Sequence, residues 1–254
     1  MLEVRELYAG YHRDLHILRG VSAIARPGQL TAILGANGVG KSTLLKAIFG
    51  FLTPASGQVL LEGVEITGTA PNQMVERGVA YGPQQPGIFA EMTVEENIMI
   101  GAWTFRRDAG RIRRKLDENY DRFPVLRGRR RSAAVELSGG QRRMVELARV
   151  LMSEPRYLLI DEPTAGVAPI VADGVYATLT VLRDEGVGIV LVDQDIRRAL
   201  RVADYVYVID LGQNRLEGPP ADLGSVETVF WQGESWAAEP PPRSMGTHGA
   251  SDPA

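Results

Sequence analysis

Nine residues near the N-terminus have the types and spacing of a phosphate-binding loop. They match the pattern G-x-x-x-x-G-K-[ST] at every fixed position, and they are Gly35, Ala36, Asn37, Gly38, Val39, Gly40, Lys41, Ser42 and Thr43. Glycines let the backbone wrap a phosphate, and the loop N–H groups point at its negative charge. We expect the Lys41 ammonium to reach the β- and γ-phosphates and the Ser42 hydroxyl to bind Mg²⁺.

The flanks of this loop predict the elements that must hold it. Residues 30–34 are apolar and β-branched, which is typical of a buried strand. Residues 42–49 carry apolar side chains at helical spacing, and Gly50 is placed to end that helix. A strand, a glycine-rich loop and a helix form the context that the motif requires, so a chance Lys-Ser in a glycine-rich turn is a poor alternative.

Two carboxylates follow a second apolar strand. Residues 157–160 predict this strand, and Asp161 and Glu162 stand at its C-terminal end, where parallel α/β sheets bind ligands. Asp161 therefore fits the Mg²⁺-holding partner of a phosphate loop. Glu162 is placed to orient or deprotonate an attacking water. The alternative is a pair of solvated loop acids.

Tyr11 and Gln84 are candidates with plain structural alternatives. Tyr11 lies in a loop before the nucleotide site, where an aromatic ring stacks on a base or simply packs on the surface. Gln84 follows a predicted strand beside a proline, where it reaches a metal or a water, or is an ordinary loop glutamine.

The run Ser138, Gly139, Gly140 and Gln141 opens a long predicted helix. Ser138 and Gln141 have the spacing of a capping box, so a plain helix N-cap accounts for them. Two consecutive glycines are costly at a helix start, however, and they leave N–H groups bare. That feature favours a second anion site.

Composition narrows the class of protein. The chain has 254 residues, 44% of them hydrophobic, and a formal net charge of −3, which gives no hint of a nucleic-acid partner. It has no cysteine, so disulfides and thiolate metal sites are excluded. The N-terminus lacks the layout of a signal peptide, and no apolar run approaches the ~20 residues of a membrane span. We expect any membrane role to pass through a partner.

Two segments stand apart in composition. From Thr93, which opens a capping box, to about residue 131 the pattern is helical and rich in arginine, either as a solvated face or as a surface for a partner or anionic lipid headgroups. Residues 233–254 are rich in Pro, Gly, Ser and Ala, and we predict a disordered tail there.

Taken together, the motifs resemble the nucleotide-binding subunit of an ATP-binding cassette (ABC) transporter. The phosphate loop, Gln84, the string Leu-Ser-Gly-Gly-Gln at 137–141 and the string Leu-Ile-Asp-Glu-Pro at 159–163 occur in the usual order and spacing. The resemblance implies an α/β P-loop core with an antiparallel β-subdomain. It also implies an ATPase domain over residues 2–232 with a helical subdomain inserted at about 90–153.

The resemblance also implies two such domains working head to tail. ATP would lie between Tyr11, the phosphate loop and Asp161 of one chain and residues Ser138 to Gln141 of the other. Mg²⁺ would be arranged by Ser42, Gln84 and Asp161, and Glu162 would handle the water.

Within this superfamily, four segments resemble the second ATPase subunit of branched-chain amino-acid importers or of their amide and urea relatives. They are residues 10–11, 93–97, 165–169 and 192–195. This implies an ATP-hydrolysing subunit in the cytoplasm, peripheral on the inner face of the cell membrane. Its partners would be a second ATPase subunit, identical or different, integral membrane permeases and, indirectly, a solute-binding protein, with no nucleic acid.

Two positions depart from the family pattern. A histidine that contacts the γ-phosphate usually follows the late strand, and here that position is Gln194. A glutamine donates a hydrogen bond but carries no positive charge, so slower hydrolysis is expected at this site. Ala168 stands where an aspartate is usual, a change that the subfamily resemblance covers.

Two other functions stay open. A nucleotide-gated module that dimerises with little hydrolysis is favoured by Gln194 and disfavoured by Glu162. The other is a soluble ABC ATPase of a non-transport assembly, and the lone cassette without a long insertion or fused second copy disfavours the repair and translation types but not all of them.

Overall fold

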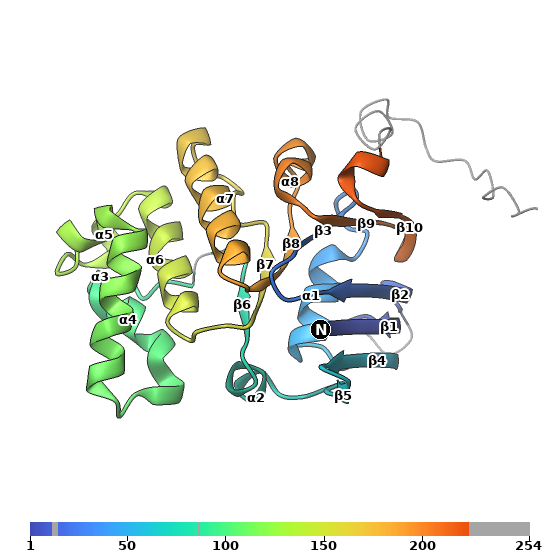
Figure 1. Ribbon diagram of the computed structural model, residues 1–254, viewed down its shortest axis with the longest axis horizontal. Coiled ribbons are helices and arrows are strands. Elements are labelled where there is room, and N and C mark those ends of the chain that lie inside the picture. The colour runs from blue at the N-terminus through green and yellow to red at the C-terminus, as the bar shows by residue number, and fades with distance from the viewer. Residues whose placement is uncertain (12–14, 86, 224–254) are drawn as a thin grey trace, which may run out of the picture. The chain divides into compact units, whose positions relative to one another are not determined.

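The computed structural model describes residues 1–11, 15–85 and 87–223 (Figure 1). The predicted tail at 233–254 lies outside the described residues, as do the last residues of the predicted ATPase domain, 224–232. Among the helices of the described ranges, none combines the length and the hydropathy needed to cross a membrane.

A six-stranded sheet forms the centre of the described chain, with the strand order β10-β9-β3-β8-β7-β6. The strands are β3 (Leu30–Leu34), β6 (Val79–Gly82), β7 (Tyr157–Asp161), β8 (Gly188–Val192), β9 (Tyr205–Asp210) and β10 (Gln213–Gly218). All run parallel except β10, which pairs antiparallel with β9. Every residue of β3, β7 and β8 is buried, which explains why these strands are apolar apart from Thr31 in β3 and Asp161 at the end of β7.

A second sheet is antiparallel and has the order β2-β1-β4-β5. Its strands are β1 (Leu2–Ala9), β2 (Leu18–Ala25), β4 (Ser56–Leu61) and β5 (Val64–Glu65). Helix α1 (Lys41–Phe49) contacts β1 as well as β6 and β7, so it joins the two sheets in one core. Helices α7 (Pro169–Asp184) and α8 (Ile196–Val202) cover the other face of the central sheet (Figure 1).

Two short helices belong to the connections of these sheets: α2 (Pro71–Glu76) precedes β6, and the 3₁₀ helix η3 (Pro220–Asp222) follows β10.

Every described element between β6 and β7 is helical (Figure 1). The elements are α3 (Val94–Met99), η1 (Ile100–Phe105), α4 (Ala109–Arg122), α5 (Pro124–Gly128), η2 (Ala134–Glu136) and α6 (Gly139–Leu151). The architecture confirms the predicted α/β fold with an antiparallel β-subdomain and an inserted helical subdomain.

The arginine-rich stretch is helical, as predicted, but it is broken into several pieces. Asp108 caps α4 by accepting a hydrogen bond from the Arg111 N–H, and Pro124 begins α5. At Gly101 the backbones pack closely, because a Cβ there would lie 1.8 Å from the Arg149 carbonyl oxygen of α6.

The glycine after α1 performs the predicted helix stop. Gly50 adopts φ 85°, its N–H donates to the Ala47 carbonyl oxygen at 3.3 Å, and the N–H of the next residue, Phe51, donates to the Lys46 carbonyl oxygen at 2.9 Å. A Cβ at this position would lie 1.9 Å from the Thr69 carbonyl oxygen. Both the left-handed backbone and the close approach therefore require glycine.

We predict that Gly50→Ala lowers the free energy of unfolding by more than about 1 kcal/mol, because alanine is strained at positive φ and clashes with backbone. The matched control is Gly174→Ala in α7, where an added Cβ meets nothing within 4 Å. That change is expected to raise the free energy of unfolding by about 0.5–1 kcal/mol. Urea unfolding curves measure both, and an unchanged or raised stability of Gly50→Ala would contradict the assignment.

Candidate functional site

Most of the predicted site residues gather at one edge of the central sheet, although they are far apart in sequence. The phosphate loop follows β3, Gln84 follows β6, Asp161 ends β7 and Gln194 follows β8. These four strands are parallel neighbours in the order β3-β8-β7-β6, so their carboxyl ends meet at the same edge. That edge is where sheets of this kind bind ligands.

The phosphate loop closes around the ammonium of Lys41. Lys41 Nζ donates hydrogen bonds to the carbonyl oxygens of Gly35 and Ala36, each at 2.8 Å, and the side chain is buried. Burial lowers the pKa of Lys41, while the carboxylates of Glu162 and Asp161 oppose that shift. The ammonium thus lies buried beside two acidic groups.

The loop itself has the features of a phosphate cradle. Gly38 adopts φ 84° and is exposed, and no atom lies within 4 Å of where its Cβ would be. Gly40 is the N-cap of α1, and no side chain caps the first N–H groups of that helix. An exposed loop glycine and uncapped N–H groups at a helix N-terminus fit a bound phosphate group.

Asp161 is hydrogen-bonded on both oxygens. Ser42 Oγ donates to Asp161 Oδ1 at 2.9 Å, and the Tyr81 hydroxyl donates to Oδ2 at 3.3 Å. Burial raises the pKa of Asp161, and the Ser42 hydrogen bond opposes that rise. A serine hydroxyl touching a buried carboxylate beside a phosphate loop is the donor set that Mg²⁺ uses together with phosphates, so the residues fit this ion.

Glu162 turns the chain sharply at the end of β7. Its N–H still donates to the Val192 carbonyl oxygen of β8 at 2.7 Å, but its φ is +43°. This left-handed conformation costs a non-glycine residue about 1–3 kcal/mol, and such strain gathers at functional sites. The side chain is buried.

Two glutamine amides hold the Glu162 carboxylate. Gln194 Nε2 donates to Glu162 Oε2 at 2.7 Å, and Gln84 Nε2 donates to the same oxygen. Within the described part of the chain, Oε1 receives no hydrogen bond. One oxygen is therefore fixed, and the other remains free to accept a proton.

Asp193, which the sequence analysis did not single out, anchors the backbone at Gln194. Its Oδ1 accepts hydrogen bonds from the N–H groups of Gln194 at 2.7 Å and Asp195 at 3.1 Å. Its Oδ2 accepts from the Tyr176 hydroxyl at 2.9 Å and from Thr164 Oγ1 at 3.0 Å. The signal was present, because Asp193 directly follows an apolar strand and Asp161 ends another.

Tyr11 lies beside α1, and the residue is more than half exposed. Lys46 Nζ of α1 donates to the Tyr11 hydroxyl at 3.1 Å and lies 5.6 Å from the ring centroid. This places the ring next to the helix that begins at the phosphate loop. Whether it stacks on a base stays a prediction.

The four predicted residues at the start of α6, Ser138 to Gln141, form the cap of this helix and a close contact with α7. Ser138 Oγ accepts from the Gln141 N–H at 3.3 Å, and Gln141 Oε1 accepts from the Ser138 N–H at 3.1 Å, so both halves of the capping box are present. A Cβ on Gly140 would lie 2.6 Å from Val171 Cγ2, so close packing against α7 requires that glycine. Ser138 and Gly139 are exposed.

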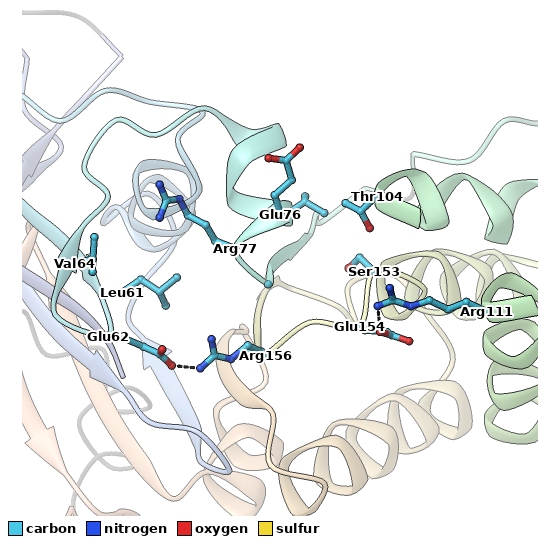
Figure 2. A pocket seen from close by; sticks show the side chains of 12 residues that line it. Leu61, Glu62, Val64, Glu76, Arg77, Thr104, Arg111, Ser153, Glu154 and Arg156 are labelled. Carbon is cyan, nitrogen blue, oxygen red and sulfur yellow. Dashed lines mark hydrogen bonds and ion pairs between the residues drawn. The ribbon is translucent and has the colours of Figure 1, made fainter. Parts of the chain in front are cut away.

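A separate cavity of about 670 Å³ contains none of the predicted site residues. Figure 2 shows the ion pairs at its wall, Glu62 with Arg156 and Arg111 with Glu154. These pairs tie the end of β4 and helix α4 to the segment that leads into β7.

Comparisons with known proteins agree with this geometry. Residues 18–165 match the model of the ABC transporter family. The chain is 41% identical to "Probable branched-chain amino acid transport ATP-binding protein LivF" of Archaeoglobus fulgidus, over 88% of this chain and 94% of that protein. It is 36% identical to "High-affinity branched-chain amino acid transport ATP-binding protein BraG" of Pseudomonas aeruginosa, over 80% and 86%.

A solved structure described as a nucleotide-free ATP-binding cassette from an ABC transporter superposes with a TM-score of 0.80 at 29% identity, over 91% of this chain and 97% of that one. The family match covers more than half of this chain and includes the phosphate loop, Asp161 and Glu162. The chain belongs to the ABC transporter family, as an ATP-hydrolysing subunit of a transporter.

Proposed function

We propose that Glu162 is the general base for ATP hydrolysis on this chain, and that the reaction powers the import of branched-chain amino acids. The observation that supports Glu162 as the general base is the geometry of its carboxylate. Glu162 follows the Mg²⁺-type ligand Asp161, is buried, and has Oε2 fixed by two amides while Oε1 is free. A general base needs this combination of a fixed position and an open acceptor atom.

The other site residues at this edge of the central sheet position ATP. Lys41 and the loop N–H groups hold the β- and γ-phosphates of ATP, and Ser42, Asp161 and Gln84 hold Mg²⁺, which neutralises charge on the phosphates when bound. The water oxygen attacks the γ-phosphorus as the bond to the ADP oxygen breaks. The water proton passes to Glu162 Oε1, while the amides of Gln84 and Gln194 keep the carboxylate oriented toward the water.

The start of α6 serves the nucleotide of a second ATPase subunit. Ser138 and Gly139 face outward, and their hydrogen bonds in the described chain reach neither the phosphate loop nor Asp161. The chain therefore works in a pair, identical or different, together with membrane permeases on the inner face of the cell membrane. A solute-binding protein delivers the solute to those permeases.

The names of the relatives LivF and BraG support branched-chain amino acids as the solute. Amides or urea are the second candidate, because the segments around Tyr11 and Gln194 resemble that branch as well.

We predict that Glu162→Gln leaves ATP binding intact and lowers kcat by about 10²–10⁴-fold, because the amide cannot accept the proton. The variant is also expected to accumulate as an ATP-bound dimer on gel filtration. Glu185→Gln, which changes an exposed acid paired with Arg122, is the matched control and should hydrolyse at the wild-type rate. Turnover of Glu162→Gln at close to the wild-type rate would show that another group is the base.

The role of Gln194 yields a separate prediction. Gln194→His keeps a hydrogen-bond donor toward Glu162 and is expected to preserve or raise kcat in the assembled complex. Gln194→Ala removes the donor and is expected to lower kcat by about tenfold or more, because the carboxylate loses one of its two fixed contacts. Steady-state phosphate release measures both. A large loss in Gln194→His would mean that the amide itself is required.

The transported solute is tested with the complete complex. The tagged chain is purified from its own membranes with its permeases and placed in liposomes with the solute-binding protein. We expect leucine, isoleucine or valine to accumulate in an ATP-dependent way, and Lys41→Ala to abolish the uptake. Uptake of amides or urea alone would replace the solute assignment, and absence of any membrane partner would favour a non-transport assembly.

A further inference from the structure

Helix α6 buries an ion pair that the reaction described above does not use. Arg143 and Glu146 stand three residues apart, are 2% and 1% exposed, and join Nη1 to Oε2 at 2.5 Å. Removing two charges from water is costly, so a buried pair is weak evidence for stability, and replacing it with apolar groups is often neutral or stabilising. The pair therefore calls for another explanation.

The guanidinium of Arg143 is hydrogen-bonded to the backbone at Gln84 and at the residue before it. Nη1 donates to the Pro83 carbonyl oxygen at 2.9 Å, and Nη2 donates to the Gln84 carbonyl oxygen. Farther along α6, Arg149 Nη1 donates to the Gly87 carbonyl oxygen at 2.6 Å. Arginines of α6 thus hold the segment after β6 by hydrogen bonds to the carbonyl groups of that segment. The Gln84 side chain is left free to reach Glu162.

Glu146 holds the Arg143 guanidinium at these carbonyl groups. Its carboxylate lies against Arg143, and burial raises the pKa of Glu146 while Arg143 opposes the rise. The planar fork of an arginine can serve two carbonyls and one carboxylate together, whereas the single ammonium of a lysine fits such a set poorly.

We propose that Arg143, with Glu146 as its counter-ion, is a positioning residue that holds the Gln84 amide on the Glu162 carboxylate. The same helix begins with Ser138 and Gly139, which face the nucleotide of the partner subunit in the function proposed above. A shift of α6 caused by that second nucleotide moves Arg143, and with it the Gln84 contact to Glu162. This inference rests on the proposed function for its consequence, but the contact itself is testable without hydrolysis.

The first test observes the amides directly in the full nucleotide-free chain. Side-chain amide signals of Gln84 and Gln194 are assigned in ¹⁵N NMR spectra from their loss in Gln84→Ala and Gln194→Ala. The double variant Arg143→Met with Glu146→Leu removes the hydrogen bonds to the Pro83 and Gln84 carbonyls and fills the space with apolar side chains. We expect the Gln84 signal to move toward that of a solvent-exposed amide, while the Gln194 signal stays, because Asp193 holds its backbone independently.

A second variant guards against failure to fold. Arg143→Lys keeps the buried charge paired and should also displace the Gln84 signal, in the same direction. Arg122→Met with Glu185→Gln removes an ion pair outside the site and should move neither signal. An unmoved Gln84 signal in both Arg143 variants would overturn the proposal. Equal movement of both glutamine signals would also overturn it, because the pair would then support the core in general.

The second test uses kinetics. The double variant is expected to lower kcat by about 10- to 100-fold with KM for ATP little changed, because a misplaced catalytic contact costs rate rather than phosphate binding. In a Gln84→Ala background the same change should lower kcat by less than about twofold, because both act through one contact. Losses that multiply would show that Arg143 acts elsewhere. Absence of hydrolysis by the wild-type complex would instead refute the proposed function, and the amide signals would still decide the inference.

Discussion

The hydrogen bonds that meet on Glu162 Oε2 are the interaction on which the site depends. The donors, Gln84 and Gln194, follow two different strands and flank β7, whose end carries the carboxylate. Their convergence requires the strand order β8-β7-β6 and a parallel sheet, because only then do all three chain segments leave at the same edge. The positive φ of Glu162 belongs to the same arrangement, since it turns the residue after β7 while its N–H still pairs with β8.

Each amide has its own buried support. The Gln194 backbone is fixed by Asp193, which accepts from the Gln194 and Asp195 N–H groups on one oxygen and from Tyr176 of α7 and Thr164 on the other. The Gln84 backbone is held from the helical subdomain by Arg143. One support thus lies between β8 and α7, whereas the other comes from α6, so the Gln84 backbone is held from the helical subdomain and the Gln194 backbone by Asp193.

The phosphate loop and its flanking elements could be predicted from the sequence because their determinants are local. Glycines, one lysine and one serine at fixed spacing specify the loop, and Gly50 specifies the end of α1. The acids at the end of β7 were predictable for a similar reason. An apolar strand followed by Asp161 and Glu162 needs no knowledge of distant residues.

Contacts between distant segments could not be predicted in this way. Gln84 allowed an ordinary loop glutamine as well as a site residue, because the sequence does not reveal that β6 lies next to β7. Arginine and glutamate are seldom fully buried, and only the packing of α6 on the segment after β6 buries Arg143 and Glu146. The breaks in the arginine-rich stretch were visible locally at Asp108 and Pro124, whereas the constraint at Gly101 comes from contact with α6.

The most direct test of the account is phosphate release by the full chain with ATP and Mg²⁺, comparing wild type with Lys41→Ala, alongside gel filtration with and without ATP. The account predicts release by the wild-type chain, alone or with its partner subunits, and loss of this chain's contribution in Lys41→Ala, because the ammonium that lies within the phosphate loop is gone. ATP-dependent dimers that release no phosphate even in the assembled complex would contradict it, and would identify a nucleotide-gated binding module instead.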